Sequence, residues 1–162
     1  MITHRFQRVR YRGLNAREQE AYNFQKISSV LADYGFVTIR LSSDWRGADF
    51  IAQHFDGSTF IKVQLKGRFT VDKKYLDRDL HIGFPDGDHW YLYPHDELLK
   101  KILESTRISN TESWLKHGSY HFPRLTKKLH ALLESYILKG QTGCSPPRST
   151  RTNVLDLRRQ EC

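Results

Sequence analysis

The most constraining feature of the sequence is a pair of alternating segments on either side of Asp56-Gly57. The segments are "ADFIAQHF" (48–55) and "STFIKVQLKGRF" (58–69). Apolar and polar residues that alternate one by one are typical of a β-strand with one apolar and one polar face. Asp-Gly between two such segments is a strong signal for a β-hairpin. The sequence therefore predicts two antiparallel strands joined by a tight turn.

A two-residue turn at this place fixes which side chains lie opposite one another. Gln53 pairs with Phe60 and Asp49 with Gln64, and a four-residue loop preserves this register. Directly opposed residues share a face, with Cβ atoms about 5 Å apart. Asp49 and Gln64 are thus expected side by side, with Lys66 further along the same face. The other face is expected to form a core layer of Phe50, Ala52, Ile61, Val63 and Leu65.

The segment before the hairpin has the pattern of an amphipathic helix, "LNAREQEAYNFQKISSVLADYG". Asn15 and Glu18 have the spacing of a capping box at its start, and Gly35 is expected to end it. Glu20 precedes Phe24 by one turn and projects from nearly the same face. The expected inward stripe comprises Phe24, Ile27, Leu31 and Tyr34.

The remaining segments complete an α/β domain with a mixed sheet. Strands are expected at 36–42, 80–84 and 89–93, and helices at 95–105 and from Pro123 to Leu138, with "NTESWLKHG" favouring a further short helix. We expect three parts: a basic N-terminal arm (1–13), the folded domain (14–139) and a tail (140–162). The tail is rich in Gly, Pro, Ser and Thr, which predicts disorder.

The charge of the chain favours a polyanionic partner. The net charge is +8, and residues 1–17 contain five arginines and no acidic residue. Nucleic acid is the natural partner of such a surface, although many soluble proteins are simply basic. The sequence contains no apolar run of about 18 residues and no signal-peptide pattern. Two cysteines in the weakly patterned tail fit a reducing compartment, so we predict a cytoplasmic protein that does not span a membrane.

The polar face of the hairpin suggests metal chemistry. Oxygens of Asp49 and Gln64 could converge on one hard cation such as Mg²⁺. Lys66 could then orient a water molecule or offset developing charge, and Glu20 could add a carboxylate from the helix. The alternative for Asp49 is an ordinary residue at a strand start, and for Glu20 a surface acid beside arginines. Asp44 is a substitute ligand if Asp49 is wrongly assigned.

These residues resemble the core of the PD-(D/E)xK nuclease superfamily, which has the restriction endonuclease-like fold. Its motif is an Asp at the start of one strand and Glu-x-Lys in the next, often with a Glu from the preceding helix. In "GADFIAQHF" and "TFIKVQLKGR", Asp49 matches the Asp, Lys66 the Lys and Glu20 the helix acid. Ala48 replaces the nominal Pro, and Gln64 stands where an acid is usual. Gln-x-Lys versions occur in some members, among them a group I intron homing endonuclease.

The resemblance covers roughly residues 14–94 and implies an αβββ core with a central mixed sheet, followed by further strands and C-terminal helices. It implies catalytic roles for Asp49, Gln64, Lys66 and Glu20. The implied metal is Mg²⁺, with Mn²⁺ as a possibility, held by Asp49, Gln64 and the backbone carbonyl of Leu65.

The leading hypothesis is therefore a metal-dependent endonuclease that hydrolyses DNA phosphodiester bonds. Because cutting both strands uses two active sites, a homo-oligomer is plausible. The alternative is a nucleic-acid-binding module on the same scaffold, with catalysis weakened or lost through Gln64. A basic protein whose partner is another protein is a third option, which no specific feature favours. The expected DNA contacts are Lys62, Arg68, Lys73, Lys74 and Tyr75, with Lys62 the one most easily explained as an ordinary edge lysine.

Overall fold

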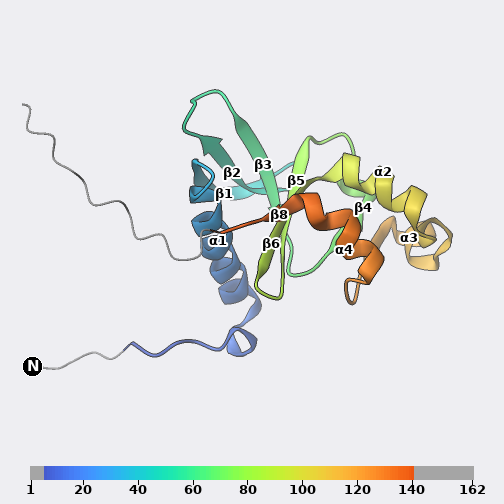
Figure 1. Cartoon of the computed structure of the whole chain (residues 1–162), viewed down its shortest axis with the longest axis horizontal. Coiled ribbons are helices and arrows are strands. Elements are labelled where there is room, and N and C mark those ends of the chain that lie inside the picture. The colour runs from blue at the N-terminus through green and yellow to red at the C-terminus, as the bar shows by residue number, and fades with distance from the viewer. Residues whose placement is uncertain (1–5, 141–162) are drawn as a thin grey trace, which may run out of the picture.

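The structure is a computed structural model that describes residues 6–140, so the first five residues of the basic arm and the tail from residue 141 lie outside the described residues. Its centre is a six-stranded mixed sheet in the order β1-β2-β3-β5-β6-β8 (Figure 1). β3 and β5 are parallel, and the other neighbours in this sheet are antiparallel. The predicted α/β fold with a central mixed sheet is confirmed, including the order α1, β1, β2, β3 at its start.

The strands and helices follow one another along the chain with short connections. The strands are β1 (Phe36–Trp45), β2 (Ala48–His54), β3 (Phe60–Leu65), β4 (Thr70–Asp72), β5 (Leu80–Asp86), β6 (His89–Pro94), β7 (Ser119–His121) and β8 (Ile137–Leu138). The helices are α1 (Ala16–Ala32), α2 (His95–Ser105), α3 (Glu112–His117) and α4 (Lys127–Leu133), with the 3₁₀ turns η1 (Tyr11–Gly13), η2 (Lys73–Tyr75), η3 (Ile108–Asn110) and η4 (Glu134–Tyr136). Within residues 6–140, no helix is both long enough and apolar enough to cross a membrane.

Helix α1 begins with the predicted capping box. The backbone N–H of Glu18 donates to Asn15 Oδ1 (3.0 Å), and that of Asn15 donates to Glu18 Oε2 (2.8 Å). Ile27 and Leu31 are buried as predicted. Tyr34 was predicted to belong to the same stripe, which is wrong, because the helix has ended by then and 41% of Tyr34 is exposed. Its hydroxyl instead bonds to the backbone of Lys139 beside β8.

The β2–β3 hairpin has the predicted register. Gln53 pairs with Phe60, and the ladder continues to Phe50 and Val63. Residues 55–59 connect the two strands, and the His54 N–H donates to Thr59 O (2.9 Å), which leaves four residues, 55–58, inside the closed loop. Within it, the Asp56 carboxylate accepts bonds from the Thr59 hydroxyl and from two backbone N–H groups, and these bonds hold its pKa well below the usual range. The local turn chemistry therefore sets the alignment of the two strands.

Two predicted elements have different ends. The strand predicted at 58–69 leaves the sheet after Leu65, and β4 pairs with β7 in a separate two-stranded sheet. The chain leaves the sheet because the Phe69 ring is buried against Phe84 and Phe122, on the other side of the main sheet. The helix predicted from Pro123 starts only after Thr126, which caps it, and ends at Leu133. The following residues form η4 and then β8, which pairs with β6.

The two faces of the sheet are covered by different helices. α1 packs Ile27 and Leu31 against Phe50, Ala52, Val63 and Leu65, which confirms the predicted core face except that Ile61 is only partly buried. The opposite face of β5 and β6 packs against residues of α2, α3 and α4 in a larger cluster. Gly83 allows α1 to approach the sheet, since a Cβ there would lie 2.6 Å from Ile27 Cδ1. The sheet is thus the middle of three layers, and the hairpin ends at its rim.

Candidate active site

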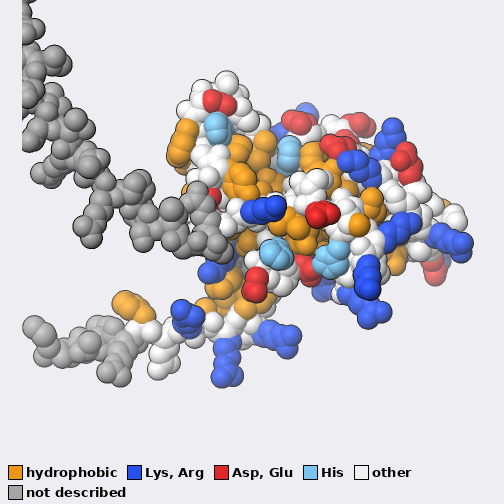
Figure 2. Space-filling view, in the orientation of Figure 1, with side chains coloured by type: hydrophobic (Ala, Val, Ile, Leu, Met, Phe, Trp, Pro, Cys, Tyr) orange, Lys and Arg blue, Asp and Glu red, His pale blue; other side chains and the backbone are white. Residues whose placement is uncertain are grey.

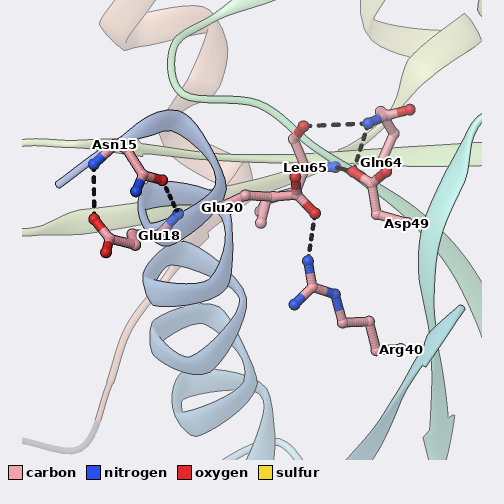
Figure 3. A network of polar contacts seen from close by, with 7 residues as sticks. All are labelled: Asn15, Glu18, Glu20, Arg40, Asp49, Gln64 and Leu65. Carbon is pink, nitrogen blue, oxygen red and sulfur yellow. Dashed lines mark hydrogen bonds and ion pairs between the residues drawn. The ribbon is translucent and has the colours of Figure 1, made fainter. Parts of the chain in front are cut away.

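The polar face of the hairpin ends in a cluster around the Asp49 carboxylate, at the start of β2 and the end of β3 (Figure 3). Asp49 Oδ2 accepts hydrogen bonds from the backbone N–H of Leu65 (2.6 Å) and from Gln64 Nε2 (2.5 Å). The β2–β3 ladder stops one pair earlier, at Phe50 and Val63. The carboxylate therefore takes the place of a ladder partner and is held at the rim of the sheet, as the register predicted.

The Gln64 amide lies between the other polar groups of the cluster. Its Nε2 also donates to the carbonyl of Leu65 (3.2 Å), and its Oε1 accepts a bond from the Tyr75 hydroxyl (3.3 Å). The Asp49 carboxylate and the Leu65 carbonyl thus converge on one positively polarised NH₂ group. The two ends of an amide are nearly equal in size, so a half-turn would place Oε1 at that point instead.

Lys66 follows directly after β3 and stays on the same side of the sheet as Gln64. Its backbone N–H donates to Gly83 O (2.8 Å), and its Nζ lies 5.2 Å from the centre of the Tyr75 ring. Since the Tyr75 hydroxyl bonds to Gln64, one tyrosine contacts both residues. The structure therefore places Gln64 in contact with Asp49, and it places Lys66 and Gln64 against the same tyrosine.

Tyr75 itself is placed differently from the prediction. Only 4% of it is exposed, whereas the sequence analysis counted it among the surface contacts for DNA. Its ring is covered by Lys66 and by Lys74, whose Nζ lies 4.9 Å from the ring centre. The pKa of Lys74 is raised above its ordinary value. Partial burial is the largest single effect and lowers this pKa, but the contacts with Tyr75 and Asp72 together outweigh it. Tyr75 thus supports two cations that face solvent, rather than facing solvent itself.

Glu20 reaches the site from α1, but it is paired. Its carboxylate bonds to the Arg40 guanidinium on β1, and both side chains are about half exposed. Glu20 lines a cleft of about 170 Å³ together with Leu65 and Lys66, and a second cleft of about 330 Å³ together with Asp49. The helix acid therefore shares one cleft with the lysine and another with the aspartate, and part of its charge is offset by Arg40, to which it is bonded in Figure 3.

Arg40 is a site residue that the sequence analysis missed. It lies opposite Phe50 in the β1–β2 ladder, on the face that α1 covers. Its guanidinium also lies 5.5 Å from the centre of the Phe24 ring. The alternation of "FVTIRLS" contained the signal, because it places Arg40 on the face of Phe36 and Thr38.

The other predicted DNA contacts fall into two groups. Arg68, Lys73 and Lys74 are exposed, and Lys73 Nζ lies 4.9 Å from the Trp114 ring. Lys62 instead donates to the backbone carbonyl of Arg78 (2.7 Å). β3 lies inside the sheet, so Lys62 is not an edge lysine, and it holds the loop before β5.

A divalent cation at this rim would depend on mixed oxygen donors. Among the described residues, no three His, Cys, Asp or Glu side chains gather where they could hold a metal ion. The Asp49 carboxylate and the Leu65 carbonyl already converge on one point, and the Gln64 amide oxygen can reach it by a half-turn. Such hard oxygen donors fit Mg²⁺ or Mn²⁺. Asp44, the predicted substitute ligand, is in β1, but its side chain lies outside the described residues.

Comparisons with known proteins give little support of their own. No protein-family model matches the sequence, and a search of curated proteins finds no significant match. Among solved structures, the chain is similar to Hjc, a Holliday junction resolvase from the archaeal hyperthermophile Archaeoglobus fulgidus. The TM-score is 0.37 and the sequence identity 13%, over 46% of this chain and 76% of that chain. At this TM-score and identity, the likeness assigns no function to the chain.

Proposed function

We propose that this protein is a metal-dependent endonuclease that hydrolyses phosphodiester bonds of DNA. One observation carries the proposal: the oxygens of Asp49 and Leu65 converge on the Gln64 amide, and Glu20 lines one cleft with Lys66 and another with Asp49. A carboxylate, a carbonyl and a lysine at one strand end can hold a cation and a phosphate side by side. The net charge of +8 fits a polyanionic substrate.

Each residue has a distinct part in this proposal. Asp49, the Leu65 carbonyl and Gln64 would hold the cation, which when bound would polarise the phosphate and lower the pKa of a coordinated water. Lys66 would keep a positive charge next to the scissile phosphate and orient the attacking water. Tyr75 would fix Gln64 through its hydroxyl and support Lys66 with its ring. Arg68, Lys73 and Lys74 would contact phosphates beyond the scissile bond.

A second candidate is a nucleic-acid-binding module without cleavage. The observation that favours it is that the Gln64 NH₂ group satisfies both oxygens by itself, while Glu20 is paired with Arg40. In this case DNA binding would weaken with salt and would not change on Asp49→Ala. The two candidates thus differ in whether a divalent cation is needed for the activity of the protein on DNA.

Nicking of supercoiled DNA separates these candidates. The wild type is expected to nick in Mg²⁺ or Mn²⁺ and to stop when EDTA is added. Lys66→Ala should abolish nicking. Lys62→Ala is the matched control on the same hairpin and should retain it, because Lys62 is tied to the Arg78 carbonyl. Absence of nicking in both metals on duplex, branched and single-stranded DNA would refute the enzymatic proposal, and salt-dependent binding unaltered by Asp49→Ala would favour the binding module.

A homo-oligomer belongs to the same proposal, since a double-strand break needs two hydrolytic events on opposite strands. Sedimentation of the wild type with and without a DNA duplex tests it. A monomer in both conditions that still makes double-strand breaks would contradict the idea of paired sites.

A further inference from the structure

A cleft lined by aromatic rings lies next to the candidate active site. It has a volume of about 630 Å³ and opens between η1, the middle of α1 and the β5–β6 turn. Its lining includes the rings of Tyr11, Tyr22 and Trp90. We infer that this cleft binds one unpaired nucleobase of a DNA strand whose backbone passes through the candidate active site. The inference rests on the proposed function and specifies its substrate class.

The cleft and the candidate active site are neighbours. Tyr11 and Asn23 line the aromatic cleft and also the smaller cleft that contains Glu20 and Lys66. A strand with a phosphate near Lys66 therefore needs only a short step to bring a base between η1 and α1. β3 and β5 run in parallel, and the last residue of β3, Leu65, pairs with Gly83, so β5 continues for three residues beyond the end of β3 toward the cleft.

The rings provide a surface for stacking. The centroids of Tyr11 and Tyr22 are 5.4 Å apart, with the planes tilted by 58°. Lys26 Nζ lies 5.4 Å from the centre of the Tyr22 ring. Aromatic and cationic groups in one groove are the features with which proteins bind unpaired bases, because every base has a π-face. The volume lies within the usual range for small-molecule sites, roughly 300–1,000 Å³.

Asn23 gives the cleft a buried polar group. Only 6% of Asn23 is exposed, and its Nδ2 donates to the Tyr11 hydroxyl (2.8 Å). An amide side chain also has an acceptor, here Oδ1, which can pair with a donor of a ligand. The edge of a nucleobase can supply that donor.

The charges around the cleft favour different parts of a bound DNA strand on its two sides. Arg12 and Lys26 line it from η1 and α1, whereas Asp86 and Asp88 line it from the β5–β6 turn. Figure 2 shows Lys and Arg side chains gathered around the end of the molecule where α1 starts. Phosphates are attracted to the cationic wall and repelled by the carboxylates, which can instead accept bonds from amino groups of a base. A continuous duplex cannot place a paired base there, so the base must be unpaired or extruded.

Fluorescence anisotropy with two labelled duplexes tests the inference. One duplex is fully paired, and the other has the same sequence with a single-nucleotide cytosine bulge. Measurements in EDTA exclude cleavage, so a failure of the proposed nuclease activity does not affect the result. The wild type should bind the bulged duplex at least about fivefold more tightly, the lower limit for stacking of one base on an aromatic ring. Tyr22→Leu should remove this preference and leave binding of the paired duplex unchanged.

Phe55→Leu is the matched control, because Phe55 is an exposed ring in the hairpin loop. It should keep the full preference. Equal affinity of the wild type for both duplexes, or an undiminished preference in Tyr22→Leu, would overturn the inference. As a second measurement, a single-stranded tetracytidylate should quench tryptophan emission in the wild type and not in the conservative variant Trp90→Phe. Quenching that persists in Trp90→Phe would also count against the cleft.

Discussion

Replacing Gln64 by Glu tests whether this amide and Asp49 share one cation position. In the structure, Gln64 Nε2 donates to the Asp49 carboxylate (2.5 Å) and to the Leu65 carbonyl (3.2 Å). Glu has nearly the same shape as Gln, but when ionised it has only acceptors. The variant therefore brings two carboxylates and one carbonyl together and removes the NH₂ donor that lies between them. We expect it to be less stable than the wild type without metal and to gain stability when a divalent cation binds.

The size of the loss follows from the geometry. Two charges about 4 Å apart repel by about 4 kcal/mol at an effective dielectric constant of 20 and by about 1 kcal/mol in water, so a half-buried pair lies near 2 kcal/mol. The lost hydrogen bond to a charged group adds about 1.5–3 kcal/mol. The loss of unfolding free energy has an upper limit at neutral pH, because the introduced Glu and Asp49 can share a proton instead of repelling each other. Raising the pKa of the Glu from about 4.3 to 7, at which it binds this proton, takes about 4 kcal/mol. The expected loss in unfolding free energy is thus about 3–4 kcal/mol.

Urea unfolding followed by circular dichroism measures this effect in EDTA and in Mg²⁺ or Mn²⁺. The cation should restore about 3 kcal/mol to Gln64→Glu once its concentration is about 100-fold above the dissociation constant. Gln53→Glu is the matched control, since Gln53 lies on the same hairpin opposite Phe60. It should change stability by less than about 0.5 kcal/mol and show no specific response to metal.

Two results would refute the reasoning. The first is a Gln64→Glu protein as stable as the wild type in EDTA, since repulsion and the lost bond would then be absent. The second is a response to metal no larger than that of Gln53→Glu. Either result would remove Gln64 from the proposed set of ligands.

Three further predictions concern the scaffold. Asn15→Ala should lower the unfolding free energy by about 1 kcal/mol in urea titration, because it removes the side-chain cap of Glu18 N–H. Gly83→Ala should destabilise by about 1–3 kcal/mol through its clash with Ile27 Cδ1, and the double variant with Ile27→Val should recover part of this loss. Burial lowers the pKa of His81, and its Nδ1 has no hydrogen-bond partner among the described residues. The unfolded chain therefore takes up a proton at this position more readily than the folded protein. The wild type should lose stability as the pH falls below about 6.5, the ordinary pKa of histidine. His81→Gln should reduce this dependence on pH in urea titrations.

Each of these predictions has an outcome that contradicts it. An unchanged Asn15→Ala protein would mean that the cap adds nothing to the native state. A double variant no more stable than Gly83→Ala alone would place the clash elsewhere than at Ile27. For His81, the control is His89→Gln, an exposed position, and an equal effect of both variants on the pH profile would contradict the role of burial.

The hairpin shows which features of the site local sequence patterns can predict. Alternation and the Asp-Gly turn were sufficient to predict that Asp49 and Gln64 are adjacent, because side-chain direction and register follow from the backbone itself. The helix start was equally predictable, since a capping box involves residues only three positions apart. The end of β3 was not, because the chain turns away where Phe69 finds partners distant in the sequence, Phe84 and Phe122.

The details of the site depended on such distant partners as well. Nothing local to Tyr75 predicts that its ring is buried under two lysines while its hydroxyl bonds to Gln64. Nothing local to Glu20 predicts its pairing with Arg40. The aromatic cleft joins Tyr11, Tyr22 and Trp90, which are up to 79 positions apart (90 minus 11).

The sequence by itself therefore determined the elements of the core, the hairpin register and the identity of the polar group at its end, because these follow from periodicity and turn geometry within one helix or one hairpin. Only the tertiary structure decided which way the Gln64 amide faces, which charges are already paired and where the aromatic rings meet. The physical reason is that these properties are set by packing between segments whose separation along the chain carries no information about their separation in space.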